Sequence, residues 1–597
     1  MCGIAGIIHN IQKDYQSNIK FMNEAQIHRG PDDVGIKKYQ NAILGHTRLS
    51  IVDISLGHQP MCSNSDNLSI TFNGEIYGFM DMKKDLNYDF RTNSDTEVII
   101  ALYTQYHSNM FQKLKGMFAF GIWDDEQKTL LLARDRFGEK PLYYAFGDKG
   151  EFIFASEIKA IIASKLLTPK VSNKAIGNYL NYLYINPLET IYDNIFTLAP
   201  ASFLRFVDGK IDIKKYYNYP TTQDISLSEA TEQFKTKFEK SVKNQLVADV
   251  DVGAFLSGGL DSSSIVAVAQ KYKKDLKTFS FGFEGLKSEL SYAREIANKY
   301  GTDHYELFSK DVDISEMLLT MATVYDEPFA DSSNIPTYLI SKLAREHSKV
   351  ILTGDGADEL LGGYEWWYNP LLGIGEKNNY LKEMTLKVLA KSFFRSYQSK
   401  AIRMKYGRKY SSIVDAHTDR SAYFNNNEIN HLLGKIDKQK RSYSFKEENT
   451  INDALKIDLQ EYMAGDILVK TDRASMANSL ELRTPFLDVD FASFCISLPF
   501  NLKITNQKDK LILREAYQSE WTETIRKRNK QGFGGPVNQW LKQKNVIALK
   551  NEYFKKHRAI FSVISFEAAK SYFSRDNYQT WALLVLSIWC EKNLKKS

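Results

Sequence analysis

The stretch VDVGAFLSGGLDSSSIVAVAQKY (residues 250–272) decides the fold of the second half of this 597-residue chain. VDVGAFL is typical of a buried strand, SGGLDSS of a loop and SIVAVAQKY of a helix. Further strand-like runs follow in KTFSFGF (277–283), HYELFS (304–309) and KVILTG (349–354), and helical stretches separate them. Strand–loop–helix repeats of this kind predict a parallel sheet with helices on both faces.

The loop LSGGLDSSS (256–264) lies between a strand and a helix, which is where open α/β sheets bind ligands. Glycines let the backbone approach phosphate oxygens, and hydroxyls with free amides at the helix N-terminus complete an anion site. The loop is not a Walker A motif, because no GxxxxGK followed by Ser or Thr is present. An ordinary Gly-Ser turn would explain SGG alone, whereas the full string in this setting predicts a phosphate site.

Residues 1 to about 215 are rich in predicted strands. TEVIIALYTQY (96–106) has helical spacing, and turn-like DDEQK and GDKG separate some of the strands. We therefore expect stacked antiparallel sheets with helices packed outside. The strand-like runs are AILGHTRLSIVD (42–53), NLSITFNGEIY (67–77), MFAFGIWD (117–124), TLLLARD (129–135) and PLYYAF (141–146).

The pattern changes around KKYYNYPTTQD (214–224), which places a domain boundary after residue 215. Ser226, followed three residues on by Glu229, fits the start of a helix with a capping box. Beyond residue 370 the chain is predicted to be mostly helical. WALLVLSIWC (581–590) is about half the roughly 20 residues that span a bilayer, so it is predicted to be a buried helix.

Composition excludes several classes of protein. Apolar residues make up 43% and charged residues 25% of the chain, as in ordinary globular proteins. The net charge of +6 is spread over the whole length without a basic tail, so we expect no nucleic-acid partner. Four cysteines without CxxC spacing argue against a disulfide framework or a zinc site. No signal peptide or membrane-spanning run is visible, and we expect a cytoplasmic protein without membrane contact.

The first ten residues, MCGIAGIIHN, place a cysteine directly behind the initiator methionine. Chance and a buried first strand would explain these residues taken alone. Removal of Met1 would, however, give Cys2 a free α-amino group, whose pKa near 7.7–8.0 makes it a local base for the thiol. The side-chain amide of Asn73 and the backbone N–H of Gly74 could then stabilise a tetrahedral oxyanion. Taken singly, Asn73-Gly74 would be read as a hairpin turn.

These stretches, with TRLSIVD, NSDTE and HRGPDD (28–33), resemble the class II glutamine amidotransferase domain in order and spacing. The resemblance implies a four-layered α/β/β/α sandwich of the N-terminal-nucleophile type over residues 2–215. It implies that Cys2 is the nucleophile, with Arg48 and Asp95 supplying the charges that a free amino-acid substrate needs. The implied glutamine contacts are Arg48, Leu49, Ser50, Ile51, Val52, Asn73, Gly74, Glu75 and Asp95.

The SGGLDS string resembles the pyrophosphate loop of ATP pyrophosphatases, and LTGDGADELLGGY (352–364) is similar to the second signature of the asparagine synthetase family. ILVKTDRASMANSLELRTPFLD (467–488) and RNKQGFGGP (528–536) also resemble this family. The resemblance implies an ATP-pyrophosphatase domain over residues 216–597. Leu256, Phe281, Thr353 and Gly354 would line the adenylate site, and Ser257, Gly258, Gly259, Asp261 and Ser262 would hold pyrophosphate.

Acidic and basic residues complete the implied nucleotide site. Asp261 and Asp358 would lie near Mg²⁺, and Asp355 could bind metal or orient the substrate, although an acidic first turn of a helix explains Asp355 and Asp358 equally well. By match to the motif, Lys530 would neutralise charge on the phosphates; Lys527 and Arg528 remain alternatives.

The resemblance as a whole implies glutamine-dependent amidation of aspartate to asparagine through a β-aspartyl-adenylate, releasing glutamate, AMP and pyrophosphate. ATP and Mg²⁺ would be required, the partners would be small molecules, and a homodimer is possible. Some family members carry an arginine shortly before the proline equivalent to Pro336, where this chain has Ser332. The alternative is therefore the same chemistry on another carboxylate, in a peptidoglycan precursor or an acidic cell-surface sugar, with Trp366 and Trp367 in residues 365–450 reshaping the pocket.

Two further classes are disfavoured. A glutamine-dependent transferase acting on sugar phosphates would share the first domain but has no use for the SGGLDSS loop. A non-catalytic scaffold would be expected to lack Cys2, Asn73 or Asp261, and all three are present.

Overall fold

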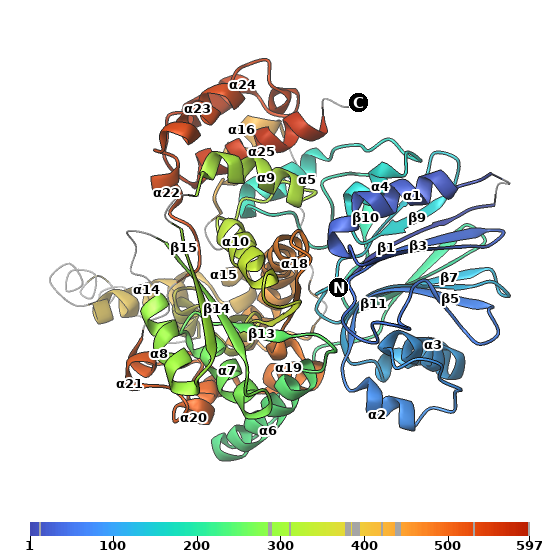
Figure 1. Ribbon diagram of the computed structural model, residues 1–597. Helices are drawn as coiled ribbons and strands as arrows, with labels where there is room; N and C mark the ends of the chain where they lie inside the picture. Colours follow the sequence, from blue (N-terminus) through green and yellow to red (C-terminus); the bar gives the residue numbers. More distant parts are fainter. Residues whose placement is uncertain are drawn as a thin grey trace.

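The computed structural model describes residues 1–10, 13–283, 289–309, 312–375, 384, 395–419, 422–435, 443, 445–528 and 532–594. The chain forms two halves that lie side by side, one blue to cyan and the other green to red (Figure 1). The first half ends with strand β12 (Lys210–Lys215), and the second begins with helix α6 (Leu227–Gln245).

Two antiparallel six-stranded sheets form the first half, as far as its residues are described. The first has the order β10-β8-β9-β1-β3-β2: Ile195–Thr197, Tyr143–Phe146, Phe152–Ala155, Gly3–Ile8, Ala42–Arg48 and Asp33–Lys38. The second has the order β12-β11-β7-β6-β5-β4: Lys210–Lys215, Ser202–Val207, Thr129–Arg134, Gly116–Asp124, Leu68–Ile76 and Met61–Cys62.

Strand β1 shows why the two sheets stack. All six of its residues are buried, because alternate side chains enter two different cores. Ile4 and Ile8 pack in the cluster between the sheets, whereas Ile7 packs in the cluster that holds α1. Helices α1 (Gln16–Ala25) and α4 (Ile158–Ala163) cover the first sheet, and α2 (Phe79–Lys84) and α3 (Asp95–Tyr106) lie beside the second. The predicted α/β/β/α layering is confirmed.

The second half contains a five-stranded sheet, counted over the described residues, with the order β15-β14-β13-β16-β17 and every pair parallel. Val350 and Leu352 pack in the core that contains α7, while Ile351 between them packs in the core that contains α10. Helices therefore cover both faces, as predicted. The strands are Val252–Phe255 (β13), Lys277–Phe283 (β14), Asp303–Ser309 (β15), Val350–Leu352 (β16) and Glu481–Arg483 (β17).

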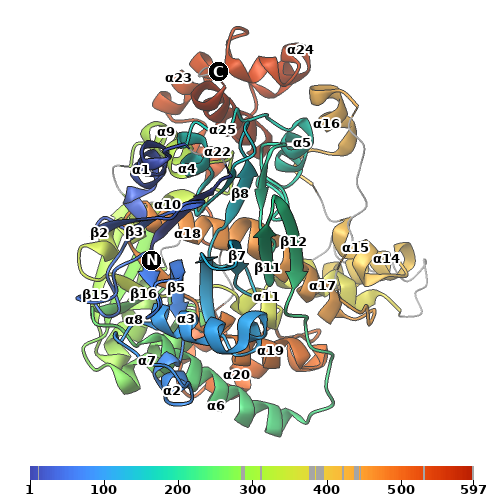
Figure 2. The ribbon, with the colours of Figure 1, turned by 90° about the vertical axis from the view of Figure 1, so that its right-hand side faces the viewer.

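Helices make up most of the rest of the second half, and α14, α15 and α17 lie together on one side of it (Figure 2). None of the helices in the described ranges is long and apolar enough to cross a membrane. The helix predicted at 581–590 is the buried centre of α25. The helices are α7 (Leu260–Tyr272), α8 (Leu290–Tyr300), α9 (Ile314–Val324), α10 (Asn334–Arg345), α11 (Ala357–Leu361), α12 (Glu365–Tyr368), α14 (Arg395–Lys409), α15 (Ile413–Thr418), α16 (Asn426–Leu433), α17 (Ile451–Asp458), α18 (Leu468–Met476), α19 (Val489–Ser497), α20 (Leu511–Tyr517), α21 (Glu523–Lys527), α22 (Val537–Trp540), α23 (Lys544–Tyr553), α24 (Phe566–Ala569) and α25 (Tyr578–Asn593).

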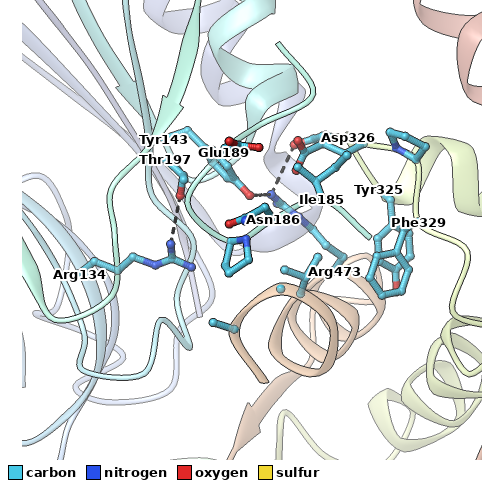
Figure 3. Close-up of a pocket in the computed structure, with 16 residues that line it drawn as sticks. Arg134, Tyr143, Ile185, Asn186, Glu189, Thr197, Tyr325, Asp326, Phe329 and Arg473 are labelled. Atoms are coloured by element: carbon cyan, nitrogen blue, oxygen red, sulfur yellow. Dashed lines mark hydrogen bonds and ion pairs between the residues drawn. The ribbon is translucent and has the colours of Figure 1, made fainter. Parts of the chain in front are cut away.

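Buried ion pairs join the two halves. Arg29 of the first half donates two hydrogen bonds to Asp472 of the second, at 2.8 and 2.9 Å. Arg473 reaches Glu157 at 2.7 Å and lies between Tyr143 and Asp326 (Figure 3). Breaking such a buried pair typically costs about 3–5 kcal/mol, because the remaining charge loses its partner. The network therefore fixes the position of one half relative to the other.

Candidate functional site

Cys2 lies at the start of β1, next to strand β5 of the second sheet. Its backbone N–H donates to Asn73 Oδ1 at 3.0 Å. This contact turns the Asn73 amide so that Nδ2 points away from Cys2 N, and Nδ2 is buried without a hydrogen-bond partner among the described residues. A buried, unpaired N–H donor is costly unless something else accepts from it. A donor beside a cysteine thiol is what an oxyanion site needs.

Asn73 and Gly74 lie inside a strand rather than in a hairpin turn. They pair with Ala119 and Phe118 of β6. A Cβ on Gly74 would lie 2.1 Å from the carbonyl oxygen of Met117, so only glycine allows this close approach.

Met1 fills the space in front of Cys2. Its ammonium nitrogen lies 2.9 Å from Oε2 of Glu481, and both groups are almost completely buried. Its side chain packs against Tyr77, Met117 and Met476. The cavity left at this site has a volume of only about 30 Å³. Burial raises the pKa of the Cys2 thiol, although the adjacent ammonium opposes the shift.

Most of the predicted glutamine contacts line this cavity: Arg48, Leu49, Ile51, Val52, Gly74, Glu75 and Asp95. Ser50 is not in the wall; its backbone N–H donates to Asp32. The guanidinium of Arg48 donates to the carbonyls of Val52, Asp53 and Ile54, so it also shapes the loop after β3. Burial raises the pKa of Asp95 to about 6.

A second and larger cavity, of about 440 Å³, lies at the carboxyl ends of β13, β14 and β16. Gly258 has φ +66°, and a Cβ there would lie 2.5 Å from the backbone of Tyr292, so glycine is required for the turn. All the residues predicted for the nucleotide site and described here line it: Leu256, Ser257, Gly258, Gly259, Asp261, Ser262, Phe281, Thr353, Gly354, Asp355 and Asp358.

One buried cation in the wall of this cavity is Lys510. Its Nζ lies 2.6 Å from Asp261 and 2.7 Å from Asp358. Burial alone would lower the pKa of Lys510, but the two carboxylates raise it above its usual value. No sequence motif pointed to Lys510. One signal was available: Lys510 directly precedes α20, where a positive charge opposes the helix dipole and calls for another partner.

The carboxylates at this site suit a metal bound together with a nucleotide. No cluster of three or more His, Cys, Asp or Glu side chains that could hold a metal is present in the described ranges. Mg²⁺ is commonly bound through one or two carboxylates plus substrate phosphates and water. Asp261 and Asp358, which Lys510 brings together, fit that donor set. The described residues do not fit a metal that is held by protein groups alone.

The basic run at 526–530 is divided between the site and the surface. Arg528 lines the cavity, where it donates to the Ser257 carbonyl at 2.9 Å and lies 4.5 Å from the ring centre of Tyr292. Lys527 is exposed and pairs with Glu523. Lys530 lies outside the described residues, so its predicted role stays a prediction.

Comparison with known proteins connects both cavities to one family. A family model for asparagine synthase matches residues 233–591, and one for the glutamine amidotransferase domain matches residues 1–217. The chain belongs to the asparagine synthase family. Asparagine synthetase [glutamine-hydrolyzing] 1 of Bacillus subtilis (strain 168) is 34% identical over 628 aligned residues, which cover 100% of this chain and 97% of the relative.

A putative asparagine synthetase [glutamine-hydrolyzing] 2 of Methanocaldococcus jannaschii is also 34% identical, over 81% of this chain and 100% of the relative. Among solved structures, a glutamine phosphoribosylpyrophosphate amidotransferase from B. subtilis covers 59% of this chain at 16% identity and a TM-score of 0.28, which is too low to support an argument.

Ser332, where the sequence predicted a departure from some family members, lies in the wall of the nucleotide cavity. Its hydroxyl accepts from the Gly535 N–H at 3.0 Å and lies 3.1 Å from the Tyr578 hydroxyl. Lys470 is the cation nearby, 3.3 Å from Asp331. Burial would lower the pKa of Lys470, but carboxylates led by Asp331 raise it.

In this member of the asparagine synthase family, helix α18 lines the nucleotide cavity near its start and ends in the apolar cluster that contains Met1. Lys470 and Thr471 line the nucleotide cavity, and Met476 packs on Met1 beside Cys2. Lys470 and Met476 are six positions apart, about 9 Å along a helix axis. The two candidate sites therefore share one structural element.

Proposed function

We propose that this chain is a glutamine-hydrolysing asparagine synthetase that forms asparagine from aspartate through a β-aspartyl-adenylate, releasing glutamate, AMP and pyrophosphate. The arrangement that carries the proposal is a nucleotide cavity and a cysteine cavity joined by one helix in a single chain. Relatives that the chain matches are named asparagine synthetase [glutamine-hydrolyzing], which supports the proposal. We propose the domain division after residue 215, and a cytoplasmic location, where ATP is available.

In the first half, the α-amino group that Met1 removal exposes takes the proton of the Cys2 thiol. The thiolate attacks the side-chain carbonyl of glutamine, and the oxyanion accepts hydrogen bonds from Asn73 Nδ2 and the Gly74 N–H. Collapse gives a glutamyl thioester, and the amine returns its proton to the leaving nitrogen as ammonia. Water then releases glutamate.

In the second half, the SGGLDS loop holds the phosphates and Lys510 neutralises their charge. Asp261 and Asp358 would hold Mg²⁺, which when bound draws charge from the phosphate oxygens. Attack of the aspartate carboxylate on the α-phosphorus forms the adenylate and releases pyrophosphate. Ammonia would reach the adenylate along α18. This path would keep it away from bulk water, in which ammonia is protonated and loses its nucleophilic lone pair.

The decisive experiment incubates purified protein with ATP, Mg²⁺, aspartate and either glutamine or ammonium, and measures asparagine and pyrophosphate. We expect equal amounts of both products with either nitrogen source. Glutamine hydrolysis without aspartate-dependent pyrophosphate release would contradict the proposed acceptor.

Processing of Met1 provides a second test. While Met1 is attached, Cys2 N is an amide nitrogen that cannot act as a base, and the Met1 side chain blocks the cavity. We expect intact-mass measurement to show the active enzyme without Met1. A preparation that retains Met1 should lose glutaminase activity by at least about a hundredfold, because a general base is missing, and should keep ammonium-dependent synthesis. Full glutaminase activity with Met1 in place would refute the assignment.

A second candidate function is the same chemistry on a larger carboxylate. The hydroxyl of Ser332 is engaged by Gly535 and Tyr578, and a cavity of about 340 Å³ adjoins the nucleotide cavity at Asp331, Trp366, Tyr462 and Tyr578. Its walls add Trp367, Tyr182, Tyr184, Tyr406 and Tyr423, which suit a ring with apolar faces. Pyrophosphate release in the presence of carboxylated sugars or peptidoglycan precursors, and not of aspartate, would favour this candidate.

A further inference from the structure

The carboxylate of Glu481 reaches the cysteine cavity from the opposite half of the chain. Glu481 opens β17, the edge strand of the parallel sheet, and lines the same cavity as Cys2. One carboxylate oxygen, Oε2, lies 2.9 Å from the Met1 ammonium, and the other, Oε1, accepts from Arg483 Nε at 2.7 Å. Burial would raise the pKa of Glu481, but the ammonium and Arg483 lower it to about 2. Glu481 is therefore an anion.

The Met1 ammonium in this position stands in for another ammonium or amine group. Glu481 is buried while Met1 is in place, and removal of Met1 takes away the partner of its Oε2. An unpaired buried carboxylate is costly, so a hydrogen-bond donor must replace the lost one. The nearest new donor is the nitrogen of Cys2, which is adjacent in sequence to the group that leaves.

We propose that Glu481 is a positioning residue that holds the mature α-amino group of Cys2 for its role as base. This inference rests on the proposed glutaminase function. It assigns part of the glutaminase site to the synthetase half.

The stereochemistry of an amine explains why two acceptors are useful. A neutral primary amine has two N–H bonds and one lone pair. Asn73 Oδ1 already accepts from Cys2 N at 3.0 Å, and Glu481 Oε2 would accept from the second N–H. The lone pair is then left for the thiol proton. When sulfur transfers that proton, the amine becomes an ammonium beside an anionic carboxylate; when the ammonium protonates the leaving nitrogen, the amine is restored.

Arg483 keeps Glu481 in place. Besides its bond to Glu481, the guanidinium reaches Glu75 Oε2 at 3.0 Å and the backbone carbonyls of Gln245 and Val247. Glu75 belongs to the first half, so the two ion pairs Glu481–Arg483 and Arg483–Glu75 cross the boundary between the halves. Because these ion pairs are buried, their geometry depends on correct docking of the two halves.

The charges around the amine predict the sign of a pH effect. The groups that interact electrostatically with the N-terminus or with Cys2 are Glu481, Glu75, Arg48 and His46, and Arg483 in turn acts on Glu481 and Glu75. Burial and Arg48 lower the pKa of His46 to about 3, so it is neutral. Removing the negative charge of Glu481 leaves the amine facing Arg483. The protonated amine then becomes less stable, and its pKa falls.

The test compares wild type with E481Q and E481D, and with K349A as a matched control. Lys349 forms another ion pair between the halves, with Asp32 at 2.8 Å, and is partly exposed. Glutamine hydrolysis is measured as kcat and KM across pH, alongside ammonium-dependent pyrophosphate release and thermal unfolding.

We expect E481Q to lower kcat for glutamine hydrolysis by about ten- to a hundredfold with little change in KM, because the charge supports proton transfer rather than substrate binding. The acidic limb of its pH profile should move to lower pH, and E481D should restore the wild-type limb. K349A should show neither change. Ammonium-dependent synthesis should be unchanged in all variants.

Two results would overturn the inference. One is an E481Q profile and kcat that match those of wild type. The other is a proportional loss of both glutamine- and ammonium-dependent activity in E481Q, which would assign Glu481 a purely structural role. Failure of E481D to restore the acidic limb of the pH profile would support the same conclusion. Absence of glutaminase activity in the wild type would instead refute the proposed function itself.

Discussion

Replacing Lys510 with alanine should abolish pyrophosphate formation with either glutamine or ammonium as nitrogen source. Lys510 lies between Asp261 and Asp358, at 2.6 and 2.7 Å, on the wall of the cavity formed by the SGGLDS loop. Without it, the two carboxylates lose the cation that they share and repel the incoming phosphates, so that both nucleotide binding and charge neutralisation suffer. Loss of one such stabilising group costs about a hundred- to a thousandfold in rate.

The control for K510A is K527A. Lys527 is exposed and pairs only with Glu523 on the same helix turn, and it was an alternative for the phosphate cation in the sequence. Its replacement should leave pyrophosphate release within about twofold, because exposed ion pairs contribute about 0–1 kcal/mol. Glutamine hydrolysis should continue in K510A, since its site lies in the other half. K510A with wild-type pyrophosphate release would assign the phosphate cation to another residue, such as Lys530 or Arg528.

The sequence predicted the site residues best where the reactive or binding groups are close together in the sequence. The SGGLDS loop, the segment from Thr353 to Asp358 and the Asn73-Gly74 pair each combine several groups in one short string. The structure places the loop, most of the segment and Gly74 in cavity walls, and Asn73 in contact with the backbone of Cys2. The periodicity of the strands likewise predicted both sheets, because burial on one or two faces imposes an alternating or continuous apolar pattern.

Residues that reach a site from a distant segment could not be predicted in this way. Lys510 approaches Asp261 across 249 positions, and Glu481 approaches Met1 across 480. Strand β17 has only three residues and lies at the edge of the sheet, where it pairs with β16 alone among the described strands. Its apolar pattern is therefore too short to identify from the sequence. Lys510 meets Asp261 through the folding of the second half, and Glu481 meets Met1 through the docking of the two halves; both are properties of the tertiary structure.

Arg48 shows a limit of a different kind. The sequence predicts a cation for the substrate carboxylate, and Arg48 does line the cavity. Its Nη atoms, however, already donate to three backbone carbonyls of the loop that follows β3. A guanidinium has five donors, so a role in shaping the loop leaves room for a substrate contact. Sequence patterns identify a residue type but not how its hydrogen bonds are shared.

Replacing Cys2 with alanine should remove glutamine-dependent asparagine formation while ammonium-dependent formation continues. Cys2 supplies the thiol directly before β1, and without it no thioester forms, so glutamine hydrolysis should fall by at least about a thousandfold. The neighbouring N–H···Oδ1 contact to Asn73 is made by the backbone and survives the change. The nucleotide cavity contains no atom of Cys2, which is why ammonium should still be used.

The matched variant is C2S, which keeps the shape of the side chain but replaces the thiol with a hydroxyl. A hydroxyl is a much weaker nucleophile near neutral pH, so C2S should resemble C2A rather than wild type. Asparagine and pyrophosphate are measured with each nitrogen source. If C2A retains glutamine-dependent synthesis, ammonia arises without Cys2 and the role of the first half must be reassigned. If C2A loses both activities, Cys2 supports the docking of the halves rather than acting on glutamine, because its neighbour Met1 shares an apolar cluster with Met476 of α18.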